Sequence, residues 1–144
     1  MINSVLTNMI IYMLSFFQLP KGVLQRLDYF RSRFFWQGDG EKKKYRLTKW
    51  SVVCRPKDQG GLGIHALQVK NEALLSKWLF KLLTEDGVWQ TMLRNKYLGQ
   101  KAVSQAYWKP GDSHFWAGLM VAKKQLFRFG SFAIKDGSEI RFWE

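Results

Sequence analysis

Cysteine, histidine and acidic residues are scarce in this chain of 144 residues, which has one Cys, two His and 11 Asp or Glu residues. A single cysteine cannot form an internal disulfide or supply a cysteine-rich zinc site. The two histidines, His65 and His114, do not stand at a metal-ligand spacing from Cys54. The sequence therefore predicts no disulfide framework, no metal site and no cofactor.

Groups for covalent or acid–base catalysis are also lacking. No pair of aspartates follows an apolar strand, as two-metal phosphoryl transfer would require. Several acidic residues fall where such side chains are common: Asp58 and Asp136 in expected turns, Glu85 and Asp86 at an expected helix end, and Asp39 and Glu41 in a glycine loop. Cys54 follows the apolar pair 52–53 and is interpreted as a small core residue, a nucleophile paired with His65 or His114 being the alternative. No catalytic residue is assigned.

Long apolar runs are missing as well. The stretch 5–17 contains Thr7, Asn8, Tyr12 and Ser15, and it is shorter than the roughly 20 residues that a membrane span needs. The N-terminus shows no basic region and no small-residue cleavage site. We expect a core helix, buried on most sides, and no membrane partner; the sequence does not indicate a compartment.

Basic and aromatic residues are abundant. Lys and Arg number 23, the formal net charge is +12, and Phe, Trp and Tyr make up 16% of the chain. A positive field of this size favours polyanionic partners, and flat side chains are used to stack on bases as well as to fill cores. The hydrophobic content of 47% argues against disorder.

Apolar residues recur mostly at helical spacing, so we predict a mainly α fold with about five helices. The expected helices cover 5–17, 21–36, 66–83, 88–97 and 114–129, with Pro20 in the first turn of the second. A short helix is predicted within 48–54, a short strand at 44–47, and a β-hairpin at 132–144 around the turn 136–137. That hairpin has no third strand, so we expect the chain to be an incomplete domain.

Five regions follow from this pattern. Residues 1–38 form a helical pair, 39–65 a basic linker between the second and third helices, and 66–99 a helical hairpin. Residues 100–112 are polar and weakly patterned, which is typical of a flexible linker. Residues 113–144 carry the last helix and the C-terminal β-hairpin.

The basic linker gives the strongest functional signal. Lys and Arg bind phosphates by charge, and the interleaved Tyr45 and Trp50 can stack on bases. A solvated basic loop, anchored to the core by its aromatic residues, is the alternative. The predicted nucleic-acid site takes most of its residues from this linker and two from the second helix: Lys42, Lys43, Lys44, Arg46, Lys49, Trp50, Arg55, Lys57, Arg26 and Arg33.

Two weaker patterns have plain structural interpretations. The glycine-rich residues 60–63 open onto a helix, as a phosphate loop would, but they lack its lysine and the preceding strand. A turn is therefore favoured. Lys70, Lys77 and Lys81 form a stripe beside an apolar helix face, where lysines commonly extend towards solvent.

Several blocks along the chain, taken in order, resemble a known family. Together they resemble the segment that follows the polymerase core in plant-type non-long-terminal-repeat retrotransposon reverse transcriptases. The resemblance covers nearly the whole chain, and the order of the blocks is more specific than any one of them. The blocks are PKGV at 20–23, FFWQG at 34–38, KK at 43–44, KW at 49–50, CRPK at 54–57, GGLGI at 60–64, NEALLSKW at 71–78, LRNKY at 93–97 and IKDGSEIRFWE at 134–144.

The resemblance implies a segment without the catalytic centre. The family's two metal-binding aspartates lie upstream in a Tyr-x-Asp-Asp motif that this sequence lacks, so no polymerase residue is carried over. Its Cys/His zinc cluster lies downstream of a Phe-Trp-Glu-like stretch, and this chain ends within that stretch at Glu144. The first two helices then resemble the thumb, which grips the primer–template duplex.

We therefore expect a non-catalytic fragment that holds RNA or DNA, without sequence preference, beside an upstream polymerase core. The rival interpretation is a protein-interaction or intramolecular packing module with no nucleic-acid role of its own. Its signal would be exposed aromatic surface, such as Phe16, Phe17, Phe34 and Phe35. Exposed apolar helices would also permit self-association.

Overall fold

The computed structural model describes residues 2–38 and 45–130, with Ser4 described by its backbone only. These residues form six α-helices and no strand, so the prediction of a mainly α fold is confirmed for the part that is described. The predicted β-hairpin at 132–144 lies outside the described residues. The α-helices are α1 (Thr7–Phe16), α2 (Lys21–Gln37), α3 (Trp50–Val53), α4 (Leu67–Thr84), α5 (Val88–Leu93) and α6 (His114–Phe129).

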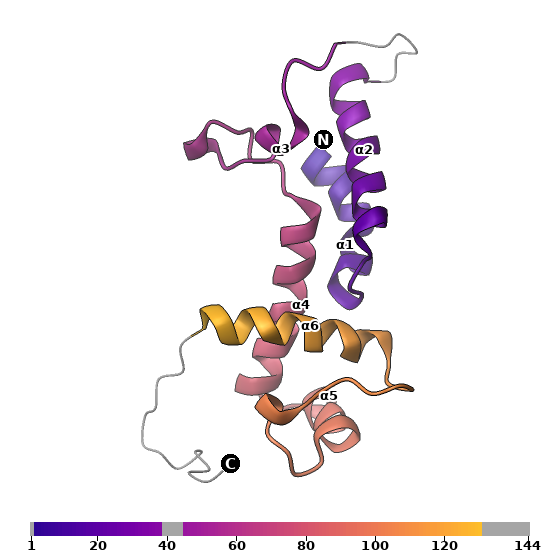
Figure 1. Ribbon diagram of the computed structural model, residues 1–144, viewed down its shortest axis with the longest axis vertical. Helices are drawn as coiled ribbons and strands as arrows, with labels where there is room; N and C mark the ends of the chain where they lie inside the picture. The colour runs from indigo at the N-terminus through magenta and orange to yellow at the C-terminus, as the bar shows by residue number, and fades with distance from the viewer. Residues whose placement is uncertain (1, 39–44, 131–144) are drawn as a thin grey trace.

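The molecule is elongated, and α4 runs along its length (Figure 1). Helices α1 and α2 lie beside the first half of α4, whereas α6 crosses its second half and α5 follows at the far end. Single turns extend the helices or join them: η1 (Ile2–Leu6) and η3 (Arg94–Leu98) are π-helical, and η2 (Lys57–Gln59) and η4 (Val103–Gln105) are 3-10 turns.

A buried asparagine on α4 fixes the turn between α1 and α2. The Asn71 side chain is fully buried, and its Nδ2 donates to the carbonyl oxygens of Leu14 at 2.6 Å and Phe17 at 2.8 Å. Its Oδ1 accepts from the backbone N–H of Leu19 at 3.1 Å. Because the last carbonyls of a helix lack partners within the helix, this one side chain sets where α1 ends.

Helix α1 is exposed on one side, which corrects the prediction of a helix buried on most sides. Leu14 is fully buried against α2 and α4, but Met9 is 75% exposed and Tyr12 67% exposed. The prediction of an apolar helix holds, but within the described residues its neighbours, chiefly α4, cover one side and leave the other open to solvent. No helix within residues 2–38 and 45–130 is both long and apolar enough to cross a membrane.

The main apolar cluster lies where α4, α5, η3 and α6 meet. Leu79, Leu82 and Leu119 are fully buried there, and full burial of such a side chain contributes about 1.5–3 kcal/mol. Trp116 of α6 is 1% exposed, and its ring stacks on Tyr97 with centroids 4.4 Å apart. Ser113 caps the start of α6 by accepting from the backbone N–H of Trp116 at 3.2 Å.

The predicted flexible linker at 100–112 is attached to its neighbours. Val103 and Ala106 are buried in the main cluster. The Lys123 ammonium donates to the carbonyl oxygens of Ser104 at 2.5 Å and Ala106 at 2.7 Å. These contacts hold the middle of the stretch against α6; its flexibility stays a prediction.

The short strand predicted at 44–47 is wrong for residues 45–47, which are irregular. Tyr45 is 94% exposed and Leu47 86% exposed, so within residues 2–38 and 45–130 their alternating pattern faces neither a second strand nor the core. The short helix predicted within 48–54 is present as α3.

Candidate nucleic-acid interface

The outer side of α2 carries basic and aromatic side chains together. Leu24, Arg31 and Ser32 form its buried side. Residues three and four apart on a helix share a face, which brings Arg26, Tyr29, Phe30 and Arg33 to the exposed side. Tyr29 is 46% exposed and Phe30 is 49% exposed, so both rings are accessible to a ligand.

The linker adds a third arginine to this surface. The Arg46 guanidinium lies over the Tyr29 ring, 5.8 Å from its centroid, and the Arg26 guanidinium lies 5.4 Å from the centroid of Phe30. Such cation–π pairs hold planar cations in place beside rings while their N–H groups remain free to bind phosphate. We call Arg26, Tyr29, Phe30, Arg33 and Arg46 the arginine–aromatic face.

A hollow of about 490 Å³ adjoins this face. It lies between α2 and the linker, and its walls include Ser32, Arg46, Lys49 and Trp50. Arg46 and Lys49 are both exposed, so two cations stand at the edge of the hollow. Of the predicted linker residues, Arg46 is thus brought to Tyr29 of α2, and Lys49 lies at the same hollow as Ser32 of α2.

Trp50 has a largely structural position. Its half-buried indole packs edge-on against Phe35, with ring centroids 6.0 Å apart, and lies under the Arg31 guanidinium at 5.7 Å. This geometry matches an aromatic residue that anchors the linker to the core, and base stacking by Trp50 stays a prediction. The predicted site residues Lys42, Lys43 and Lys44 lie outside the described residues.

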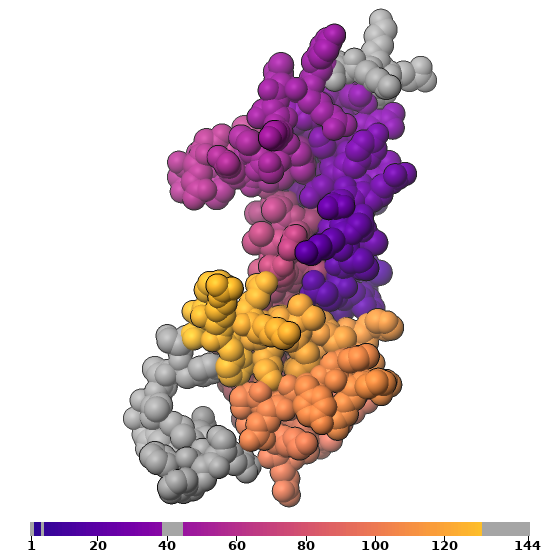
Figure 2. Space-filling model, viewed as in Figure 1, coloured from indigo at the N-terminus to yellow at the C-terminus, as the bar shows by residue number. Residues whose placement is uncertain are grey.

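Arg55 and Lys57 belong to a compact loop that stands out from the body of the molecule beside α3 (Figure 2). Both side chains are exposed. The loop is closed by backbone hydrogen bonds: Gly61 N–H donates to the Pro56 carbonyl and Gly63 N–H to the Arg55 carbonyl, each at 3.0 Å. Arg55 and Lys57 are therefore not part of the arginine–aromatic face.

The glycine-rich loop has the geometry of a turn. Its N–H groups are engaged with backbone carbonyls, whereas a phosphate loop would present them to the ligand. Gly60 has a φ of 78°, in the left-handed region that glycine adopts readily. A Cβ on Gly61 would overlap the carbonyl oxygen of Arg55. These glycines close the loop, in agreement with the favoured interpretation.

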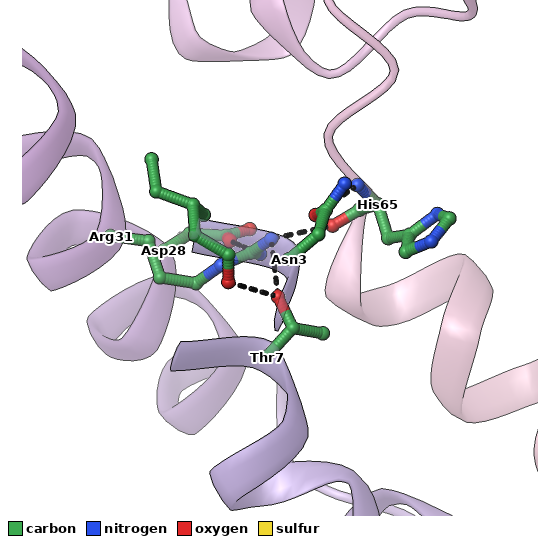
Figure 3. A network of polar contacts seen from close by, with 6 residues as sticks. Asn3, Thr7, Asp28, Arg31 and His65 are labelled. Carbon is green, nitrogen blue, oxygen red and sulfur yellow. Dashed lines mark hydrogen bonds and ion pairs between the residues drawn. The ribbon is translucent and has the colours of Figure 1, made fainter. Parts of the chain in front are cut away.

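A buried arginine that was not predicted from the sequence holds together α1, α2 and the segment before α4 (Figure 3). Arg31 is 3% exposed, and its Nη1 lies 2.7 Å from Asp28 Oδ1. Its Nη2 donates to Thr7 Oγ1 at 3.2 Å and to the His65 carbonyl oxygen at 2.9 Å. One guanidinium thereby joins α2 to α1 and to the segment before α4.

Asn3 extends the same network. Its Nδ2 donates to the Gly63 carbonyl at 3.1 Å, and its Oδ1 accepts from the His65 backbone N–H at 3.3 Å. The only sequence signal for this network was the three-residue spacing of Asp28 and Arg31, which is common on helix surfaces. The network fixes α2 and thus the orientation of the arginine–aromatic face.

Cys54 has a structural environment. It packs with Val53 and Ile64, and desolvation by burial raises the pKa of its thiol, with the Asp28 carboxylate adding to the effect and Arg31 opposing it. A raised pKa keeps the sulfur protonated and unreactive near neutral pH. In the described part of the chain, no three His, Cys, Asp or Glu residues are grouped as a metal site would need.

The lysine stripe on α4 is partly paired. Lys77 is exposed, Lys70 is half-buried, and Lys81 lies 3.4 Å from the Glu85 carboxylate. An ion pair of this kind at a helix end is ordinary surface chemistry. The arginine–aromatic face, in contrast, has one acidic neighbour on α2, Asp28, and that carboxylate is already bound by Arg31.

Comparison with known proteins gives two similar plant proteins. The chain is 37% identical to an Arabidopsis thaliana protein named as a ribonuclease H protein, over 98% of this chain and 23% of that protein. It is 27% identical to an uncharacterized mitochondrial protein of Arabidopsis thaliana, over 92% of this chain and 88% of that protein. The chain thus spans about a quarter of the first protein's length. No family model and no solved structure matches it.

Proposed function

We propose that the chain is a non-catalytic segment of a plant retroelement reverse transcriptase, which holds RNA or DNA beside the polymerase core without reading its sequence. The ordered sequence blocks support this ancestry, as does similarity to a longer plant protein named for ribonuclease H. In this proposal residues 1–38 are a thumb-like pair, 39–65 a basic linker and 66–99 a helical hairpin. Residues 113–144 lead towards a zinc-binding region.

The arginine–aromatic face is the observation that carries the nucleic-acid role. Three arginines from two segments meet there, and two of them are held over exposed rings. Guanidinium groups contact phosphate oxygens of any sequence, so this surface favours backbone binding over base reading. The net charge of +12 adds a long-range attraction for a polyanion.

The test is a titration of the full chain with labelled duplex and single-stranded oligonucleotides. We expect binding to both, weakened about tenfold or more between about 50 and 200 mM salt through counterion release. The variant R26A/R33A/R46A should bind both ligands more weakly and with a smaller salt slope. Absent binding at low salt, or binding insensitive to salt, contradicts the proposal.

A matched control separates local geometry from net charge. Lys77, Lys96 and Arg128 are exposed cations on α4, η3 and α6. The variant K77A/K96A/R128A removes the same charge as R26A/R33A/R46A, and we expect it to weaken binding less. Equal losses would mean that net charge alone drives binding. K42A/K43A/K44A/R46A should also weaken binding to all sequences, because it removes the densest run of cations.

The proposed lack of catalysis has its own test. With primer, template, nucleotides and magnesium, the purified chain should extend no primer, since two-metal phosphoryl transfer needs a carboxylate pair. Extension that persists through repeated purification would contradict the non-catalytic assignment.

A second candidate function rests on the exposed side of the N-terminal helical turns. Val5, Met9, Tyr12 and Met13 are 47–75% exposed and share one face by their spacing. No charged residue occurs before Lys21. An uncharged apolar face on a strongly basic chain favours burial against other protein, and we assign it to the polymerase core of the longer parent.

Substitution of this face distinguishes the second candidate. M9K/Y12K should leave the fold intact, because both side chains are largely exposed. It should abolish binding of the chain to a separately expressed polymerase core, measured by sedimentation or light scattering. Unchanged association excludes this face as the contact. Loss of self-association alone would assign the face to a second copy of the chain instead.

A further inference from the structure

A second group of exposed aromatic residues lies at the other end of the molecule, on the segment between η4 and α6. This segment runs alongside α6 in the opposite direction (Figure 1). Tyr107 is 59% exposed and Trp108 is 48% exposed, and both side chains border a hollow of about 520 Å³. The α6 residues Met120, Val121 and Lys124 form the facing wall.

Cations surround these rings. The ammonium groups of Lys109 and Lys101 lie 5.2 Å and 6.0 Å from the Tyr107 ring centroid. Lys124 adds a further cation on the facing wall, and the one acid in the segment 101–124 is Asp112. The Asp112 carboxylate accepts from the backbone N–H of Lys109 at 2.8 Å, so it serves the local turn.

A half-buried contact holds one wall of the hollow in place. The Lys123 ammonium donates to the carbonyls of Ser104 and Ala106, directly before Tyr107. Burial lowers the pKa of Lys123, which agrees with an ammonium partly withdrawn from water. The rings therefore stand on an anchored segment, and less conformational freedom is lost when a ligand binds.

We propose that this hollow binds an unpaired base of single-stranded nucleic acid, with Tyr107 and Trp108 in contact with the base and nearby lysines on the flanking phosphates. The inference rests on the proposed nucleic-acid role, and it adds a second binding site that accepts single strands only. An apolar hollow bordered by rings and cations suits a flat apolar group that carries anions. In a duplex the base faces are covered by their neighbours, so only an unpaired strand can use these rings.

The two surfaces thus differ in the ligand that each binds. The arginine–aromatic face binds phosphates of either duplex or single strand, whereas the hollow is selective for single strands. In a segment that holds a template beside a polymerase, such a hollow would engage the strand before or after it pairs.

The test compares the full chain with the variant Y107A/W108A, using a single strand of about 10 nucleotides and a duplex of equal length. Loss of stacking should weaken single-strand binding about tenfold or more and leave duplex binding within about twofold, since stacking contributes roughly 1–3 kcal/mol per base. Phe80, 55% exposed on α4, supplies the matched control F80A, which should change neither affinity. W108F keeps a ring and should retain most single-strand binding.

A second measurement requires no substitution. A single strand that carries 5-bromouracil should photo-crosslink to Tyr107 or Trp108 in the unaltered protein, as located by mass spectrometry. Equal losses on duplex and single strand in Y107A/W108A, or crosslinks confined to α2 and the linker, would overturn the inference. The two proposals can be told apart. Duplex binding retained in R26A/R33A/R46A would contradict the role of the arginine–aromatic face, whereas loss of single-strand binding in Y107A/W108A would still support the role of the hollow.

Discussion

The two halves of the molecule are held together by different chemistry. Around the first half of α4, the buried guanidinium of Arg31 joins α1, α2 and the segment before α4, and apolar packing is split into separate small clusters. Around the second half, one continuous apolar cluster joins α4, α5, η3 and α6, and the charged contacts lie at its rim. The stability of the first half therefore depends on the polar partners of Arg31, and that of the second half on the packing of buried apolar side chains.

The difference has a functional counterpart. The polar network orients α2, whose other side is the arginine–aromatic face, so that surface is only as rigid as the bonds of Arg31. The apolar cluster supports α6 and the anchored segment that carries Tyr107 and Trp108. A substitution that destabilises the polar network should therefore weaken binding at the arginine–aromatic face more than at the hollow beside Tyr107 and Trp108. A substitution that destabilises the apolar cluster should do the reverse.

The largest expected loss of stability is in the half around α5, η3 and α6, which is called the apolar half. Trp116→Ala removes a ring that is 1% exposed and stacked on Tyr97, and it should lower the free energy of unfolding by about 3–5 kcal/mol. Chemical denaturation monitored by circular dichroism measures this. Trp108→Ala, at a site 48% exposed, is the control and should change stability by no more than about 0.5 kcal/mol. Similar losses from both would mean that the cluster is not the core of this half.

The next largest loss of stability is expected in the half that Arg31 joins, which is called the polar half. Arg31→Met keeps much of the side-chain volume but leaves Asp28 and the His65 carbonyl without their partner, and it should cost about 2–3 kcal/mol. Arg33→Met lies two residues further on the exposed side of α2 and should be nearly neutral. If Arg31→Met is neutral or stabilising, apolar packing holds this half too.

A smaller loss of stability is expected at Lys123, which donates to backbone carbonyls as Arg31 does but lies nearer the surface. Lys123→Met removes two bonds to backbone carbonyls, which water can partly replace at this half-buried site, and should cost about 1 kcal/mol. Lys124→Met, at an exposed position, is the control for loss of one charge. A loss as large as that of Arg31→Met would show that both halves depend equally on buried cations.

Much of the helical framework was predictable from sequence because it depends on local signals. The predicted helix at 114–129 coincides with α6, and the helix predicted at 21–36 differs from α2 by one residue at its end. In α2, Pro20 directly before the helix and Gly38 directly after it mark the ends. The same spacing rules correctly placed Arg26, Tyr29 and Arg33 on one side of α2.

What depends on distant contacts was not predictable. The partners of Arg31 at Thr7 and His65 are 24 and 34 residues away in sequence, so its burial leaves no local pattern. The position of Arg46 over Tyr29 likewise depends on the path of the linker. For α1, composition indicated an apolar helix but not which neighbours are present to cover it.

The smallest expected effect is a pH dependence in the polar half, where Cys54 packs near Asp28. Desolvation, with the Asp28 carboxylate, raises the pKa of the thiol above its ordinary value of 9.0, so the folded chain keeps this proton to higher pH than the unfolded chain. The folded state binds more protons in that window, and its stability must fall as pH rises. The contribution is fully present below pH 9.0 and is lost as pH rises through the folded pKa. Stability measured from neutral pH to above that value should therefore decline more in the native chain than in Cys54→Ala, because alanine carries no titrating group. Parallel declines in the two proteins would show that the thiol is not desolvated by the packing of α3 against α2.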